Sequence, residues 1–165
     1  MAIDPARSPE HEILPADGEV IRAVSLPEGL RQPVEIEVAE HWVPVVHLAL
    51  LIAMKLVSAS SNNRPHDLED ACAAMAVYEQ SGSRRYEIDY ERFGEASYET
   101  AGALLAGLDS AEMIEAPTRH AIDVAIAQHL AATQLTDRYA DGPARRKLVL
   151  AFRTGLSSSL KPRRD

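Results

Sequence analysis

The sequence has little of several residue types, and each shortage excludes a class of protein. Its one cysteine, Cys72, excludes an intramolecular disulfide and is typical of a reducing compartment, so we expect a cytoplasmic protein. No apolar run approaches the roughly 20 residues of a membrane-spanning helix, and we expect no membrane contact. Aromatic residues make up only 5% of the chain, so the core must be aliphatic, which favours helices over a β-sandwich.

The chain of 165 residues suits one domain with a single core. Its formal net charge of −8 argues against nucleic-acid binding by the isolated chain. Residues 1–19 are rich in proline and acidic side chains and lack periodicity, so a disordered leader without signal-peptide character is predicted there. A single domain is predicted over 20–156 and a frayed tail over 157–165.

Short extended segments are predicted in the first part of the domain. Residues 19–26 alternate weakly and could form a strand, and residues 27–30 have the composition of a turn. Residues 34–38, V-E-I-E-V, alternate cleanly and predict a half-buried strand. Residues 43–46 contain a proline, which predicts an edge strand.

Glu35 and Glu37 are expected on one face of the predicted strand, because side chains alternate between the two faces. Two carboxylates on one face can hold a divalent metal ion. They are also typical of the solvent side of an edge strand. Residue types favour the solvent side, and both interpretations stay open.

The densest group of charges on an apolar frame lies in residues 47–79, HLALLIAMKLVSASSNNRPHDLEDACAAMAVYE. Residues 47–58 are apolar on nearly every face and predict a buried central helix. The polar run that follows predicts a loop, because its short side chains compete for backbone hydrogen bonds. A second helix is predicted to begin between Pro65 and Asp67. Its buried face is expected to consist of Leu68, Ala71, Cys72 and Met75, with Ala76 at the margin.

Four charged residues gather around this helix–loop–helix: Lys55, Arg64, Asp67 and Asp70. In a structural interpretation, Lys55 pairs with a carboxylate, because an ammonium group in an apolar helix needs water, a ligand or an acid. In a functional interpretation, Lys55 and Arg64 donate to the phosphates of an anionic ligand and Asp67 orients them. Residue types alone favour the structural interpretation.

The order L-I-A-M-K-L, short loop, R-P-H-D-L-E-D resembles the closing part of the AbiEii-like nucleotidyltransferases, within the polymerase-β-type nucleotidyltransferase superfamily. The resemblance covers residues 33–79 and, more loosely, the helical tail. It implies that Lys55 contacts the phosphates of a nucleoside triphosphate and that Asp67 fixes the nucleotide site, with Arg64 and Asp70 as companions. It also implies two Mg²⁺ ions that assist transfer of a nucleotidyl group to an acceptor hydroxyl.

The sequence departs from this family at the catalytic motif. In the family, a Gly-Ser pair and an Asp-x-Asp or Asp-x-Glu precede the lysine helix, and no such motif precedes Lys55. Residues 82–83 (G-S) and 89–91 (D-Y-E) are similar but follow that helix, so they are interpreted as a turn and a helix start. Glu35 or Glu37 stands near the place of the superfamily's third carboxylate. A truncated or degenerate nucleotidyltransferase-like protein, inactive alone, is therefore expected.

The rest of the chain is predicted to be helical from Asp89 to nearly its end. Gly107 is expected close to one helix end and residues 109–110 at the start of the next helix, which we expect to break at Pro117. A final helix should open at residues 141–143.

These elements predict an α+β fold with a small sheet remnant over 20–46 and a helical body over 47–156. The alternative function is a non-catalytic helical interaction module that binds a protein partner or a second copy, as toxin–antitoxin components do. The basic run 145–147 is predicted to be a solvated helix face or a docking patch.

Overall fold

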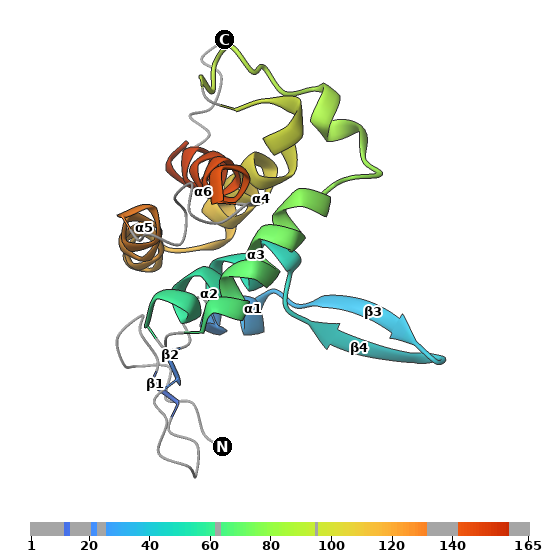
Figure 1. Cartoon of the computed structure of the whole chain (residues 1–165). Helices are drawn as coiled ribbons and strands as arrows, with labels where there is room; N and C mark the ends of the chain where they lie inside the picture. The colour runs from blue at the N-terminus through green and yellow to red at the C-terminus, as the bar shows by residue number, and fades with distance from the viewer. Residues whose placement is uncertain are drawn as a thin grey trace.

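The computed structural model describes residues 12–13, 21–22, 26–61, 64–94, 96–131 and 142–158 (Figure 1). The predicted α+β class is confirmed, since short antiparallel strands on the N-terminal side are followed by a helical body. Most of the predicted leader, and all but the first two residues of the predicted tail, lie outside the described residues. Within the leader, β1 (Glu12–Ile13) pairs with β2 (Ile21–Arg22), which falls in the predicted weak strand.

A helix replaces the turn that was predicted at residues 27–30. This helix, α1 (Leu26–Arg31), has a proline and an acidic residue in its first turn, and both suit a helix N-terminus. Glu28 is buried and accepts a hydrogen bond of 2.7 Å from the hydroxyl of Thr118, on the distant helix α5 (Ala116–Ala131). The turn prediction was wrong because the composition of residues 27–30 does not show the long-range hydrogen bond between Glu28 and Thr118.

Two longer strands form a hairpin that projects from the helical body (Figure 1). β3 (Val34–Val38) pairs antiparallel with β4 (His41–Val45). The turn between them has positive φ at Ala39 (47°) and Glu40 (67°), which is the type I′ geometry that suits the twist of the strands. The prediction of a half-buried strand at 34–38 was wrong, because the hairpin extends away from the described helices and every residue of β3 is exposed.

The predicted helix pair is present as α2 (Leu48–Ser61) and α3 (Pro65–Val77). α2 continues past its predicted end at Ser58, because the serine hydroxyls find partners that leave the helix intact: Ser58 donates to Asp67, and Ser60 to the carbonyl of Val57. α3 begins at Pro65 and buries the predicted face, with Ala76 exposed.

α2 is central, but it is not buried on every side. Leu50, Ile52 and Leu56 are fully buried, and they belong to one core shared with the helices that follow. Leu51, which falls on the outer side, is 38% exposed. The prediction that this helix is buried on all faces is therefore wrong for the side that carries Leu51.

The chain between α3 and the next α-helix is less helical than predicted. Turns and two short 3₁₀ helices, η1 (Ser83–Tyr86) and η2 (Tyr98–Thr100), precede α4 (Ala101–Met113). Ala96 is buried in the core and Tyr90 and Phe93 pack against it, but these contacts are made from segments that are not helical, so the helical spacing of the apolar residues was misleading. The described residues of 89–97 thus lie in turns and a short extended piece rather than in a helix.

α4 lies against α6 (Gly142–Ser157), the final helix, which opens where predicted (Figure 1). Gly107 lies inside α4, not near its end, because a Cβ there would collide with the carbonyl oxygen of Phe152 on α6. Gly155 on α6 faces the carbonyl oxygen of Leu104 in the same way. The helix after α4 begins just before Pro117, so this proline starts α5 and does not break it. Among the helices of the described residues, none has the length and apolar character needed to cross a membrane.

Candidate functional site

The structure brings Lys55, Asp67 and Asp70 together where α2 packs on α3. The Lys55 ammonium donates to Asp67 Oδ1 at 3.0 Å and to Asp70 Oδ2 at 2.8 Å. The Ser58 hydroxyl donates to the other Asp67 oxygen at 2.7 Å. The predicted pairing of Lys55 with Asp67 is therefore confirmed, and Asp70 joins it. Arg64 stands just before α3, and its charge acts on the Asp67 carboxylate.

Hydrogen bonds and opposite charges in this Lys55 cluster stabilise the ionised forms against the opposing effect of burial. The hydrogen bond to Asp70 raises the pKa of Lys55; burial opposes this effect and the bond to Asp67 reinforces it. Burial would raise the pKa of Asp67, but the hydrogen bonds from Ser58 and Lys55 together lower it below its ordinary value. The exposed side-chain fractions are 27% for Lys55, 19% for Asp67 and 61% for Asp70. The Lys55–Asp67 pair is thus partly withdrawn from water, while Asp70 remains mostly hydrated.

The arrangement of the Lys55 cluster limits what it can do chemically. One ammonium group is held by two carboxylates, and carboxylates repel the oxygens of a phosphate. A triphosphate would have to replace at least one of them at Lys55 to form charge-assisted hydrogen bonds there. The geometry therefore favours the structural interpretation, in which the cluster joins α2 to α3.

Glu35 and Glu37 share one face of β3, as predicted, but β3 belongs to the hairpin that projects from the helical body, whereas the Lys55 cluster lies on α2 and α3 (Figure 1). Magnesium in proteins is held by several oxygen ligands in a near-octahedral arrangement. Within the described part of the chain, no group of three or more His, Cys, Asp or Glu side chains is placed to hold a metal ion. These two carboxylates alone do not provide the two-Mg²⁺ site that the resemblance implies.

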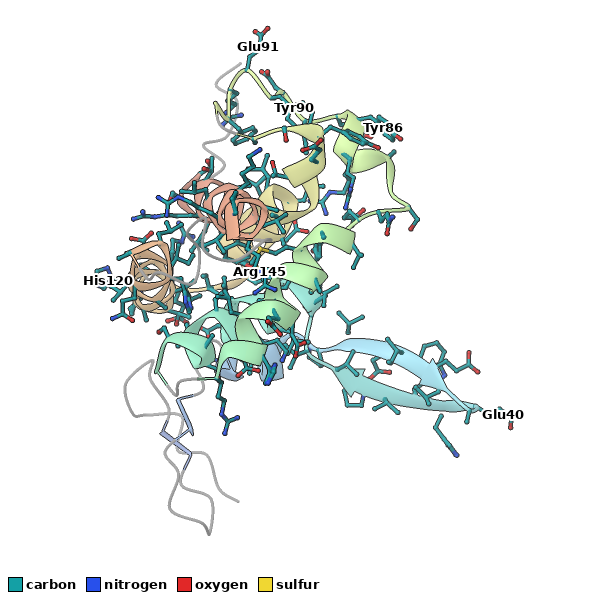
Figure 2. The ribbon with its side chains drawn as sticks, viewed as in Figure 1. Glu40, Tyr86, Tyr90, Glu91, His120 and Arg145 are labelled. Atoms are coloured by element: carbon teal, nitrogen blue, oxygen red, sulfur yellow. The ribbon has the colours of Figure 1, made fainter. Side chains whose placement is uncertain are left out.

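Residues 82–83 and 89–91, which resemble the family's catalytic motif in composition only, lie in turns and at the start of η1. This matches their interpretation as a turn, although no α-helix follows directly. Asp89 and Glu91 are exposed. They lie in the connector between α3 and α4, beyond the end of the helix pair that carries the Lys55 cluster (Figure 2).

Sequence reasoning missed a second polar cluster, formed by Arg84, Asp109 and Tyr78. Arg84 donates twice to the Asp109 carboxylate, at 2.8 and 2.6 Å, and the Tyr78 hydroxyl donates to it at 2.6 Å. These bonds and the charge of Arg84 lower the pKa of Asp109 against the opposing effect of burial. The groups satisfy one another and join Tyr78, at the end of α3, and Arg84 of η1 to α4. The predicted helix start at residues 109–110 was wrong, because α4 continues through these residues to Met113.

Two histidines, His129 and His120, occupy different environments on α5. His129 is buried, and its Nε2 lies 2.6 Å from the carbonyl oxygen of Leu56, so Nε2 carries the proton and donates to α2. Burial lowers the pKa of His129. His120 is exposed on the outer side of α5 (Figure 2).

The basic run 145–147 makes specific contacts as well as facing solvent. Arg145 lies 3.4 Å from the Glu69 carboxylate on α3, and Arg146 donates to the carbonyl oxygen of Leu130 on α5 at 2.7 Å. These two arginines therefore help to position α6 against its neighbours. Lys147 is exposed.

One surface of the hairpin is apolar and exposed. Because side chains alternate along each strand, the valines and isoleucine of β3 share a face with Val43 and Val45 of β4. We call this the apolar hairpin face: Val34, Ile36, Val38, Val43 and Val45. Val34, Ile36, Val38 and Val43 are 40%, 42%, 51% and 40% exposed. Side chains of these types are usually buried in a sheet, but on this hairpin they contact water.

The resemblance to the AbiEii-like nucleotidyltransferases rests on residues 51–56 and 64–70. The structure assembles Lys55, Asp67 and Asp70 from these two motifs into one cluster. None of the protein-family models, curated proteins and solved structures compared with this chain matches it.

Proposed function

We propose that this protein is a non-catalytic interaction module, whose helical body presents the hairpin β3–β4 to a protein partner. The observation that carries the proposal is the exposure of the apolar hairpin face. Antiparallel strands usually pack one face on a core, and a two-stranded hairpin alone is only marginally stable in water. A contiguous exposed apolar patch is typical of a binding surface.

The Lys55 cluster also supports this proposal, because its hydrogen bonds disfavour phosphate binding by Lys55. Its ammonium group already has two carboxylate partners, whereas a phosphate site needs cations that can turn toward the ligand. The charges of the Lys55 cluster therefore serve the packing of α2 on α3, and recognition is assigned to the projecting hairpin because its apolar face is exposed.

Photo-crosslinking in the native cell tests this function. A photoreactive amino acid replaces Val38 on the apolar hairpin face, and the matched control replaces Val124, which is 43% exposed on α5. We expect a protein adduct from position 38 only, and loss of this adduct when Ile36→Lys is added. Equal adducts from both positions, or none from position 38, would contradict the proposal.

A second candidate is a degenerate nucleotidyltransferase-like protein that binds a nucleoside triphosphate. It is favoured by the partly exposed Lys55, with Arg64 close to the same carboxylate. In this hypothesis Lys55 and Arg64 contact the phosphates, and Asp67 and Asp70 turn toward other partners. Mg²⁺ would arrive with the triphosphate, because Glu35 and Glu37 lie on the hairpin and not on the helices that carry the Lys55 cluster.

Calorimetric titration with ATP and GTP, with and without Mg²⁺, separates the two candidates. The interaction module predicts no saturable binding. Binding that is lost in Lys55→Met but kept in Lys147→Met, which removes an exposed lysine of α6, would favour the nucleotide-binding hypothesis.

A further inference from the structure

We propose that the outer edge of β3 pairs with an extended segment of a partner protein in which apolar and basic side chains alternate. This inference rests on the interaction function proposed above, and it adds the edge, the binding mode and the charge of the partner. Addition of a strand to an open sheet edge is a recurrent way in which proteins bind peptides.

The two outer edges of the hairpin differ in their backbone groups. In an antiparallel pair joined by a two-residue turn, residues alternate between positions bonded across the pair and positions whose N–H and C=O point outward. Counting from the turn, Glu37 and Glu35 occupy outward positions on β3, and Pro44 occupies one on β4. Pro44 has no N–H, so the edge of β4 is interrupted. The edge of β3 presents complete peptide groups at both outward positions.

The side chains of β3 specify what kind of strand can lie beside it. Glu35 and Glu37 project on one face, and the apolar residues of β3 project on the other. A strand added at this edge places its own alternate side chains on the same two faces. Lysine or arginine beside the glutamates, and apolar residues beside Val34, Ile36 and Val38, match both faces at once.

The same pattern disfavours a second copy of this chain as the occupant. Antiparallel pairing of two β3 edges sets the glutamates of one copy beside those of the other, and like charges directly opposite one another destabilise a sheet. Charged residues on an edge strand commonly prevent self-association in this way. The net charge of −8 also repels a second copy at long range and attracts a basic segment.

Trp42 provides a specific reporter for this edge. It is the one tryptophan of the chain, it is 65% exposed, and it lies directly opposite Glu37 on the acidic face. Because Trp42 belongs to β4, a strand added at the far side of β3 does not displace it. A bound basic strand would neutralise the glutamates and order the hairpin, and both changes should alter the fluorescence emission of Trp42.

The test titrates the full chain with a capped synthetic peptide of about nine alternating valine and lysine residues, the length of a typical strand or slightly more. The control peptide alternates valine and glutamate. We expect a saturable change in Trp42 emission with the valine–lysine peptide only, and an affinity that falls as salt is added because the attraction is partly electrostatic. Equal binding of the two peptides, or binding of neither, would overturn the inference.

Paired variants test the edge and the charge separately. Glu37→Pro removes an outward N–H, and Glu37→Ala removes the same charge but keeps the N–H; we expect the proline variant to lose binding and the alanine variant to weaken it. Glu35→Lys combined with Glu37→Lys should transfer the preference to the valine–glutamate peptide, which tests the inference even if Glu37→Pro disrupts the hairpin. Unchanged preference after this charge reversal would overturn it.

Two further outcomes separate this inference from the proposed function. If position 38 still crosslinks to a protein while no peptide binds, strand addition is wrong and the interaction function stands. If neither is observed, both are wrong. Sedimentation that detects a dimer sensitive to Glu37→Pro would overturn the inference in favour of a second copy.

Discussion

At the scale of single residues, several polar groups inside this protein are satisfied by partners from distant parts of the chain. The Thr118 hydroxyl bonds to Glu28, the Ser110 hydroxyl to the carbonyl of Ala49, and His129 to the carbonyl of Leu56. A buried polar group without a partner costs about 1–3 kcal/mol. Each of these bonds therefore favours one relative position of the two helices that it joins.

The Lys55–Asp67 pair should show a measurable energetic coupling. Asp67→Ala leaves a partly buried ammonium with only its exposed carboxylate partner, whereas Lys55→Met leaves no charge in α2 and leaves Asp67 with the Ser58 hydroxyl and the charge of Arg64. We expect Asp67→Ala to cost about 1–2 kcal/mol and Lys55→Met less than about 1 kcal/mol, since the pair is partly solvated. Urea denaturation of both single variants and the double variant measures the coupling. Strictly additive effects would contradict an energetic interaction between Lys55 and Asp67 in the folded state.

His129 should make stability depend on pH near neutrality. Burial lowers the pKa of His129, so between this value and about 6.5 the unfolded chain binds more protons than the folded chain. The free energy of unfolding should therefore fall as pH decreases below about 6.5. The pKa values of Asp67 and Asp109 are also lowered, but their contributions are lost only as pH falls below about 4.

Chemical denaturation between pH 7.5 and 5.5 isolates the histidine effect. The control is His129→Gln, which keeps an N–H donor near the Leu56 carbonyl and does not titrate. We expect the variant to lose less stability than the native chain over this range. An identical loss in the two proteins would show that His129 does not carry the effect.

At the scale of elements, the two sides of α2 should tolerate truncation differently. Leu56 is fully buried, so Leu56→Ala should cost about 2–5 kcal/mol through lost burial and the cavity left behind. Leu51 is 38% exposed, and Leu51→Ala should cost less than about 1 kcal/mol. Denaturant titration of both variants compares them directly. Equal costs would mean that the solvent side of α2 is covered by another part of the protein.

The contact between α4 and α6 should depend on its two glycines. A Cβ at Gly155 meets backbone atoms of Leu104 and Leu108, and a helix backbone cannot yield as a flexible side chain can. Gly155→Ala should therefore destabilise by about 1–3 kcal/mol, although alanine favours a helix by about 1 kcal/mol. In the control Gly82→Ala, the nearest atom belongs to the flexible carboxylate of Glu79, and the change should be small. Similar thermal stabilities of the two variants would contradict this close approach.

At the scale of the whole molecule, the helical body and the hairpin should not unfold together. The described hairpin contacts water on both faces, so its local unfolding free energy should lie below that of the core. Urea unfolding followed by Trp42 emission should have a lower midpoint than unfolding followed by far-ultraviolet circular dichroism, which reports the helices. Coincident curves would place the hairpin in the same cooperative unit as the helices.

A turn variant provides the control for this experiment. Ala39 and Glu40 both adopt positive φ, which costs about 1–2 kcal/mol for residues other than glycine. Ala39→Asn with Glu40→Gly suits the type I′ turn and should raise the emission midpoint while leaving the dichroism midpoint unchanged.

The sequence by itself determined the elements whose signals are local. Apolar runs placed α2 and α6, Pro65 with its following acidic residues placed the start of α3, and alternation placed β3. The Lys55–Asp67 pair was also predictable, because a short loop joins the two helices and a lysine in an apolar helix needs a counter-ion. The scarcity of aromatic residues correctly indicated an aliphatic helical core.

Only the tertiary structure decided which faces are covered and which distant groups meet. The exposure of the hairpin, the helix at α1 and the place of Gly107 within α4 all depend on neighbours that local periodicity does not encode. The Arg84–Asp109 pair joins residues 25 positions apart through the packing of η1 on α4. Side-chain spacing along a chain records how one element can bury a face, while the packing of other elements determines whether that face is buried at all.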